Sequence, residues 1–132
     1  MLLFPGEERF YTDCSWAKVI PDRLGSRLVC HGECPRDHRP LSCRIFPLVM
    51  KGTVQEDGTF LANITMDVRA WPVCPLMQSG RKGLKAAFVD AVKVAAVLLS
   101  KEDKHRAFLI ALSEELEAYE QMKRTFLSGR DG

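Results

Sequence analysis

The sequence predicts an α+β protein in which a small β-rich cysteine-cluster half packs on a C-terminal two-helix hairpin. Two observations lead to this prediction. All five cysteines, all seven prolines and both tryptophans lie before residue 81, together with six of the nine glycines. Residues 81–128 contain no cysteine or proline and only one glycine. Because Pro and Gly mark turns and disfavour helix interiors, short strands and loops are expected first and helices afterwards.

The first predicted hairpin lies early in the chain. Residues 17–20 and 27–30 flank a turn-prone stretch at 21–26 that contains Pro, Asp and Gly. Turn residues between two such runs are typical of a hairpin. Residues 31–44 then lack apolar periodicity and carry Cys, His, Arg and Asp, so we expect a ligand-binding loop there.

The second predicted hairpin has the clearer pattern. Residues 45–54 and 59–68 bracket Asp57-Gly58, a dipeptide typical of tight hairpin turns. Phe60 and every second residue after it are apolar as far as Val68, which is the period of a half-buried strand. Prolines within residues 71–75 end this β meander.

Two helices are predicted in the second half. The first runs from about residue 81 to 99 with Ser79 as its cap, and the second runs to about residue 127. Each has an apolar face at helical spacing, and we expect these faces to pack together as an antiparallel pair, with His105 facing solvent. The expected apolar positions are Leu84, Phe88, Ala91, Val92, Ala95, Leu98 and Leu99, then Phe108, Leu112, Leu116, Tyr119, Met122 and Phe126. Residues 1–132 are thus expected to form a single domain, with a cysteine-cluster part at 1–80 and a helical part at 81–128.

The overall composition is that of an ordinary globular protein. Of the 132 residues, 46% are hydrophobic and 27% are charged, which excludes a disordered chain and a polytopic membrane protein. The formal net charge is only +2, so we expect neither a nucleic-acid nor a membrane partner. The apolar start at residues 2–4 is shorter than the core of a signal peptide, and we therefore expect a cytoplasmic protein. In that reducing compartment, clustered cysteines bind metals or do redox chemistry more often than they form disulfides.

Four of the five cysteines form a candidate metal site: Cys30, Cys34, Cys43 and Cys74. Four thiolates are the full ligand set of a tetrahedral zinc ion or of one [4Fe–4S] cluster. The spacing is not that of a zinc knuckle, and Cys34-Pro35 and Cys74-Pro75 resemble the Cys-Pro steps of ferredoxins. Both cofactors, zinc or a [4Fe–4S] cluster, stay open, as does the alternative of unliganded thiols in a small core.

The surroundings of these cysteines are basic. Residues 18–51 contain seven Lys or Arg residues against three acids, which would offset the negative charge of a thiolate centre. A weak nucleic-acid patch and a plain solvated loop are the alternatives. His31 and His38 could replace a cysteine as ligands, although a hydrogen-bonding role beside the centre is more usual. Cys14 is expected to be an ordinary buried cysteine.

No catalytic motif accompanies the candidate site. The sequence has no phosphate-binding glycine loop, no His-Glu-x-x-His and no Gly-x-Ser-x-Gly. A Cys–His nucleophile pair from the loop is arithmetically possible. We expect a metal-binding protein rather than an enzyme, with a protein partner not specified by the sequence. The alternative is an iron–sulfur redox or electron-transfer component of a protein-modification system.

Three stretches carry a resemblance to a known family. They are Cys30-His31-Gly32-Glu33-Cys34, the run from Arg39 to Leu48, and Cys74-Pro75-Leu76. Together with Phe4-Pro5-Gly6-Glu7-Glu8, they resemble the bacterial cysteine-cluster proteins described as zinc- or iron-chelating. The resemblance implies a bound metal or iron–sulfur cluster at Cys30, Cys34, Cys43 and Cys74. The adjacent Cys-Cys pair of many family members is missing here, which leaves the type of centre open. Flagellin lysine methylases have a related cluster, but this chain carries no further motif for that chemistry.

Overall fold

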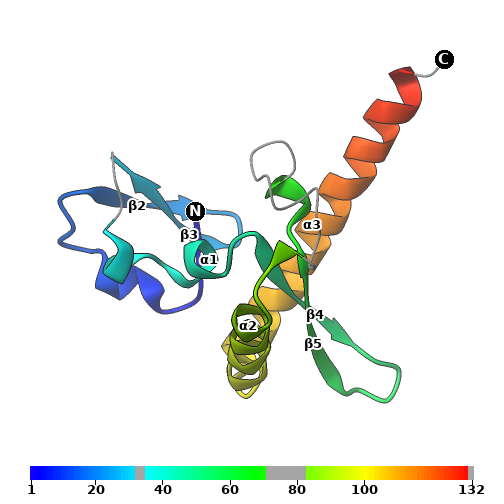
Figure 1. Ribbon diagram of the computed structural model, residues 1–132, viewed down its shortest axis with the longest axis horizontal. Coiled ribbons are helices and arrows are strands. Elements are labelled where there is room, and N and C mark those ends of the chain that lie inside the picture. Colours follow the sequence, from blue (N-terminus) through cyan, green and yellow to red (C-terminus); the bar gives the residue numbers. More distant parts are fainter. Residues whose placement is uncertain (32–34, 71–82, 131–132) are drawn as a thin grey trace.

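The computed structural model describes residues 1–31, 35–70 and 83–130, and these form two small antiparallel sheets followed by two long helices (Figure 1). This arrangement confirms the predicted α+β class. The first sheet has the strand order β1-β3-β2, and the second pairs β4 with β5. The strands are β1 (Leu2–Leu3), β2 (Ala17–Asp22), β3 (Gly25–Cys30), β4 (Leu48–Val54) and β5 (Phe60–Met66). The helices are α1 (Leu41–Ile45), α2 (Ala86–Leu99) and α3 (Asp103–Arg130), with 3-10 turns η1 (Glu7–Phe10), η2 (Arg36–His38) and η3 (Val68–Ala70).

The first hairpin is tighter than the sequence suggested. Asp22 pairs with Gly25, so only two residues form the turn. The carboxylate of Asp22 accepts a hydrogen bond from the backbone N–H of Leu24 at 3.1 Å, and Gly25 has a φ of 140° that favours glycine. Strand β1, which was not predicted, adds a third strand beside β3.

The second hairpin forms where it was predicted, with shorter strands. Leu48 pairs with Met66 and Val54 pairs with Phe60, and the turn lies at Asp57-Gly58. Gly58 has a φ of 87°, which an L-residue rarely adopts and which explains the Asp-Gly pair. The predicted strand residues 45–47 do not belong to β4, because α1 continues to Ile45.

The two long helices pack mainly on the second hairpin. The principal contacts of α3 are with β4, and those of α2 are with β5. Figure 1 shows α2 almost end-on while α3 crosses the view obliquely, so the helices run at a large angle to one another instead of lying side by side. Helix α2 starts at Ala86, later than the predicted residue 81, and the predicted cap Ser79 lies outside the described residues.

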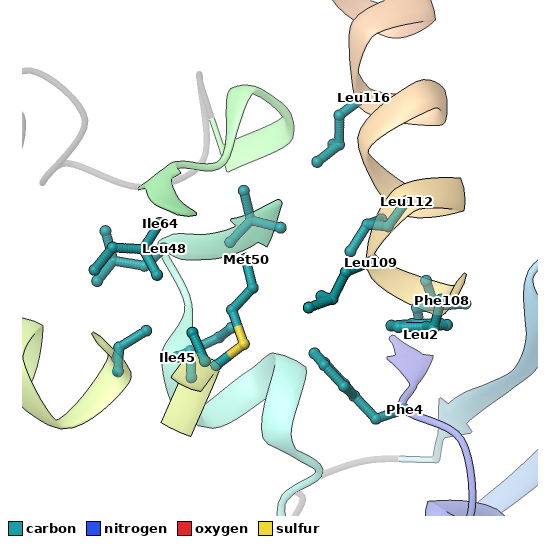
Figure 2. Close-up of a cluster of buried hydrophobic side chains, with 13 residues drawn as sticks. Leu2, Phe4, Ile45, Leu48, Met50, Ile64, Phe108, Leu109, Leu112 and Leu116 are labelled. Atoms are coloured by element: carbon teal, nitrogen blue, oxygen red, sulfur yellow. The ribbon is translucent and has the colours of Figure 1, made fainter. Parts of the chain in front are cut away.

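One apolar core joins the N-terminal segment to the hairpin and the helices. Figure 2 shows Leu109 and Leu112 pointing from α3 toward Met50 of β4. Met50 is completely buried. The ring of Phe4 lies 4.8 Å from that of Phe108, centroid to centroid. Because Phe4 follows β1 and Phe108 belongs to α3, this contact ties the first sheet to the last helix. A second, smaller cluster consists of Leu3, Tyr11, Ala17 and Leu28.

The predicted helix faces are partly correct. Val92, Phe108, Leu112 and Leu116 are buried as expected. In contrast, Leu98 and Met122 are exposed, and the C-terminal half of α3 extends beyond the rest of the chain in Figure 1. The prediction that His105 faces solvent is wrong, because this residue is only 9% exposed. Within the described ranges, no helix has the length and apolar character needed to cross a membrane.

Candidate metal centre

Two of the four predicted ligands lie in the part of the chain that the structure describes. Cys30 is the last residue of β3 and is exposed, and Cys43 is a half-buried residue of α1. Cys34 and Cys74 lie outside the described residues. Within residues 1–31, 35–70 and 83–130, no three His, Cys, Asp or Glu side chains come together as a metal-binding group. Cys30 and Cys43 are among these residues, whereas Cys34 and Cys74 are not.

Strand β1 connects the element that carries Cys30 to the one that carries Cys43. On one side, the Met1 amino group donates a hydrogen bond to the Leu28 carbonyl at 2.7 Å, two residues before Cys30. On the other side, the Ser42 hydroxyl donates to the Leu2 carbonyl at 2.7 Å, next to Cys43. The N-terminal segment therefore lies between β3 and α1, and both cysteines flank it.

The pKa of the Met1 amino group reflects several neighbouring groups. Burial lowers the pKa of its amino group, and the positive charge of Arg27 lowers it further. Attraction to Cys43 and to Cys30 raises the pKa of this group. The hydrogen bonds of Met1 and Ser42 connect the N-terminal segment to the strand that carries Cys30 and to the helix that carries Cys43.

The backbone just before Cys43 is held by side chains. Arg44 donates from Nη2 to the Asp37 carbonyl at 2.9 Å and from Nε to the Arg39 carbonyl at 2.8 Å. The hydroxyl of Tyr11 donates to the carbonyl of His38 at 2.7 Å. Three successive carbonyls are therefore fixed by groups outside residues 37–39. Such bonds give an exposed loop a defined shape that burial alone does not supply.

Glu7 fixes the start of α1 in a similar way. Its carboxylate accepts a hydrogen bond from the Leu41 N–H at 2.9 Å and another from the Phe4 N–H at 2.7 Å. The first N–H groups of a helix have no partner within the helix, so this carboxylate stabilises α1 while it anchors α1 to the N-terminal segment. Sequence reasoning missed Glu7 and Tyr11, and it treated Arg44 only as a compensating charge. The role of Arg44 could have been suspected from its position directly after Cys43.

The other candidate residues have simpler roles in the structure. His31 is exposed, and its backbone N–H donates to the Trp16 carbonyl at 2.7 Å. His38 is exposed, and its carbonyl accepts the Tyr11 bond. Cys14 is half-buried and packs against the second apolar cluster, in keeping with a structural cysteine. The buried Nδ1 atom of His105 has no hydrogen-bond partner among the described residues.

Comparison with protein-family models, with curated proteins and with solved structures finds no match for this chain.

Proposed function

We propose that the protein holds one metal centre, a zinc ion or a [4Fe–4S] cluster, through Cys30, Cys34, Cys43 and Cys74. The observation that carries the proposal is the position of Cys30 and Cys43. They come from a strand and from a helix, and hydrogen bonds at 2.7 Å connect both elements to the N-terminal segment between them. Metal sites are commonly closed by ligands from separate elements, because the metal then stabilises the fold that presents them.

The donor set suits both kinds of centre. Thiolate sulfur is the preferred ligand of structural zinc and of iron–sulfur clusters. A zinc ion would supply a structural cross-link, whereas an iron–sulfur cluster would supply one-electron transfer. The bonds from Arg44, Tyr11 and Glu7 support the proposal, since they shape the segment that carries Cys43 before any metal binds.

The biological role that we propose is that of a metal-binding or accessory protein of the cytoplasm. Thiols stay reduced there and remain able to bind metal. The resemblance of the cysteine-bearing stretches to the zinc- or iron-chelating bacterial proteins supports the same role. If the purified protein contains iron and sulfide, the proposed role becomes electron transfer by an iron–sulfur cluster.

The test is anaerobic purification followed by metal and sulfide analysis and a visible spectrum. One zinc per chain and no colour would establish the zinc site. About four irons with matching sulfide and a brown colour would establish the cluster. A chain that retains no metal after anaerobic expression and reconstitution would overturn the proposal.

Two cysteine variants locate the centre. Cys43→Ser is expected to lose the metal, because it removes the one ligand of the four that α1 supplies. The matched control is Cys14→Ser, which removes a half-buried thiol at the second apolar cluster and should leave the metal content unchanged. Full metal content in Cys43→Ser, or equal loss in both variants, would show that the proposed ligand set is wrong.

A further inference from the structure

A cavity of about 280 Å³ lies between the first sheet and the second hairpin. Its walls come from elements far apart in sequence: β1, β3, α1, β4, η3 and α3. Much of the lining is apolar and buried, including Phe4, Ile45, Leu48 and Leu112. Small-molecule sites combine apolar walls with a few polar groups and typically measure about 300–1,000 Å³, so this slightly smaller cavity suits a ligand of only a few heavy atoms.

Two arginines line this cavity from opposite parts of the fold. Arg27 belongs to β3 of the first sheet, and Arg69 belongs to η3, after the second hairpin. Each guanidinium is held by a nearby carboxylate. Arg27 Nε donates to Asp22 Oδ1 at 3.1 Å, and Arg69 donates from Nε and Nη2 to Asp67 at 3.0 and 2.9 Å. These bonds fix the direction of both side chains, which is how a binding arginine is oriented in advance.

Hydrogen-bonding capacity remains on both arginines. A guanidinium has five N–H donors, and the carboxylates use only part of this set. Among the described residues, neither Nη atom of Arg27 has a hydrogen-bond partner, and the same is true of Nη1 of Arg69. Asp67, which also lines the cavity, is only 6% exposed and accepts three hydrogen bonds from Arg69, including one from the backbone N–H. Each of the two ion pairs therefore retains N–H donors that a ligand could use.

Met1, which carries the amino terminus, also lines the cavity. Besides burial, which is the larger cause, Arg27 and Arg69 both lower the pKa of the Met1 amino group. Cys43 and Cys30 act on this pKa in the opposite direction. A bound anion would favour the charged form of this amino group, whereas a cation would disfavour it.

We propose that this cavity binds a small organic carboxylate with an apolar body. The carboxylate would accept hydrogen bonds from Arg27 and Arg69, and the body would lie against Phe4, Leu48 and Leu112. Planar carboxylates match the guanidinium fork, and the apolar walls exclude water from the rest of the ligand. A purely inorganic anion would leave those walls uncovered, and an uncharged apolar ligand would leave the donors unsatisfied.

The first experiment measures binding to the full chain by isothermal titration calorimetry. Hexanoate is the probe, with acetate and hexanol as matched compounds that lack the apolar body or the charge. Hexanoate is expected to bind at least about tenfold more tightly than either, because only it satisfies both parts of the cavity. Absence of hexanoate binding, or equal binding of hexanol, would overturn the proposal.

The second experiment tests the arginines. Arg27→Gln should weaken hexanoate binding about tenfold and leave the melting temperature nearly unchanged, because its side chain is 42% exposed. The matched control is Arg23→Gln in the same hairpin, whose exposed side chain pairs with Glu115 and does not line the cavity. If Arg27→Gln binds hexanoate as tightly as the unchanged chain, the proposed role of this arginine is wrong.

Arg69 needs a different variant, because removing it alone would leave the buried Asp67 charge unpaired. The double variant Asp67→Asn/Arg69→Gln removes both charges together and keeps the fold testable. It should lose hexanoate affinity by a similar factor, and unchanged affinity would count against the site.

Discussion

The hydroxyl of Ser113 in α3 accepts a hydrogen bond from the backbone N–H of Gly52 in β4 at 2.8 Å. These residues lie 61 positions apart, and the bond satisfies a strand N–H at the edge of β4 that does not face β5. The same hydroxyl donates to the Leu109 carbonyl within the helix at 2.7 Å. Helix and strand are thus joined by a specific polar contact inside an otherwise apolar interface, and two predictions follow from its geometry.

Gly52→Ala should destabilise the protein by about 1–3 kcal/mol, because the new methyl group overpacks the interface. A Cβ at this position would lie 2.6 Å from Cζ of Phe60 and 2.9 Å from Cβ of Leu109. The Phe60 ring can move, but Leu109 Cβ is fixed to the backbone of α3. Urea unfolding measures the loss, with the exposed neighbour Thr53→Ala as control, expected within about 0.5 kcal/mol of the unchanged chain. Equal stability of Gly52→Ala would show that α3 does not approach β4 this closely.

Ser113→Ala should cost about 1 kcal/mol and speed the exchange of the Gly52 amide hydrogen, because that N–H loses its acceptor. Ser113→Thr retains the hydroxyl and should restore slow exchange. Thr125→Ala is the matched control, since Thr125 also donates to a carbonyl one turn earlier, that of Gln121, but is exposed. Unchanged exchange at Gly52 in Ser113→Ala would contradict the contact.

The local patterns in the sequence were sufficient for the second hairpin. Asp57-Gly58 needs a backbone that glycine provides, and the alternation after Phe60 is set by which side chains face α2 and α3. The arrangement of the helices was not predictable in the same way. An apolar stripe predicts that a helix face is buried, but it does not predict which element packs against that face. Here the strands of the second hairpin pack against both helices.

The errors on α3 have a physical cause too. His105 follows Lys104 in the last predicted helix and has no partner near it in sequence, which suggested a solvent-facing side chain. Its spacing to Phe108, Leu109 and Leu112 nevertheless places it on the buried face, and that period was the better guide. Near the candidate metal centre, the side-chain bonds that shape residues 37–41 were beyond sequence reasoning, because they depend on η1 and α1 being folded together.

Arg44→Lys should weaken metal retention about 10- to 100-fold if the proposed centre includes Cys43, because residues that orient a metal ligand contribute on this scale. Lysine keeps the positive charge, but its single ammonium group cannot donate to the carbonyls of Asp37 and Arg39 at the same time in the way that the planar guanidinium does. The measurement is competition with a chelator. Arg39→Lys is the control, since the Arg39 side chain is exposed and makes no hydrogen bond among the described residues. Equal weakening in both variants would assign the effect to charge and not to loop shape.

Asp22 gives the first hairpin a pH-dependent stability. The hydrogen bond from the Leu24 N–H, aided by Arg27, holds the pKa of the Asp22 carboxyl below its ordinary value. A carboxyl with a lowered pKa in the folded state stabilises the fold above its unfolded pKa of about 4, and this contribution is lost as the pH falls through the lower, folded value.

Asp22→Asn keeps an oxygen acceptor for Leu24 but cannot ionise. The unchanged chain should therefore exceed this variant in unfolding free energy by about 0.5 kcal/mol near neutral pH, as for other exposed pairs. The difference should shrink below about pH 4 in urea titrations at a series of pH values. A difference that stays constant down to pH 2 would show that the charge of Asp22 does not contribute.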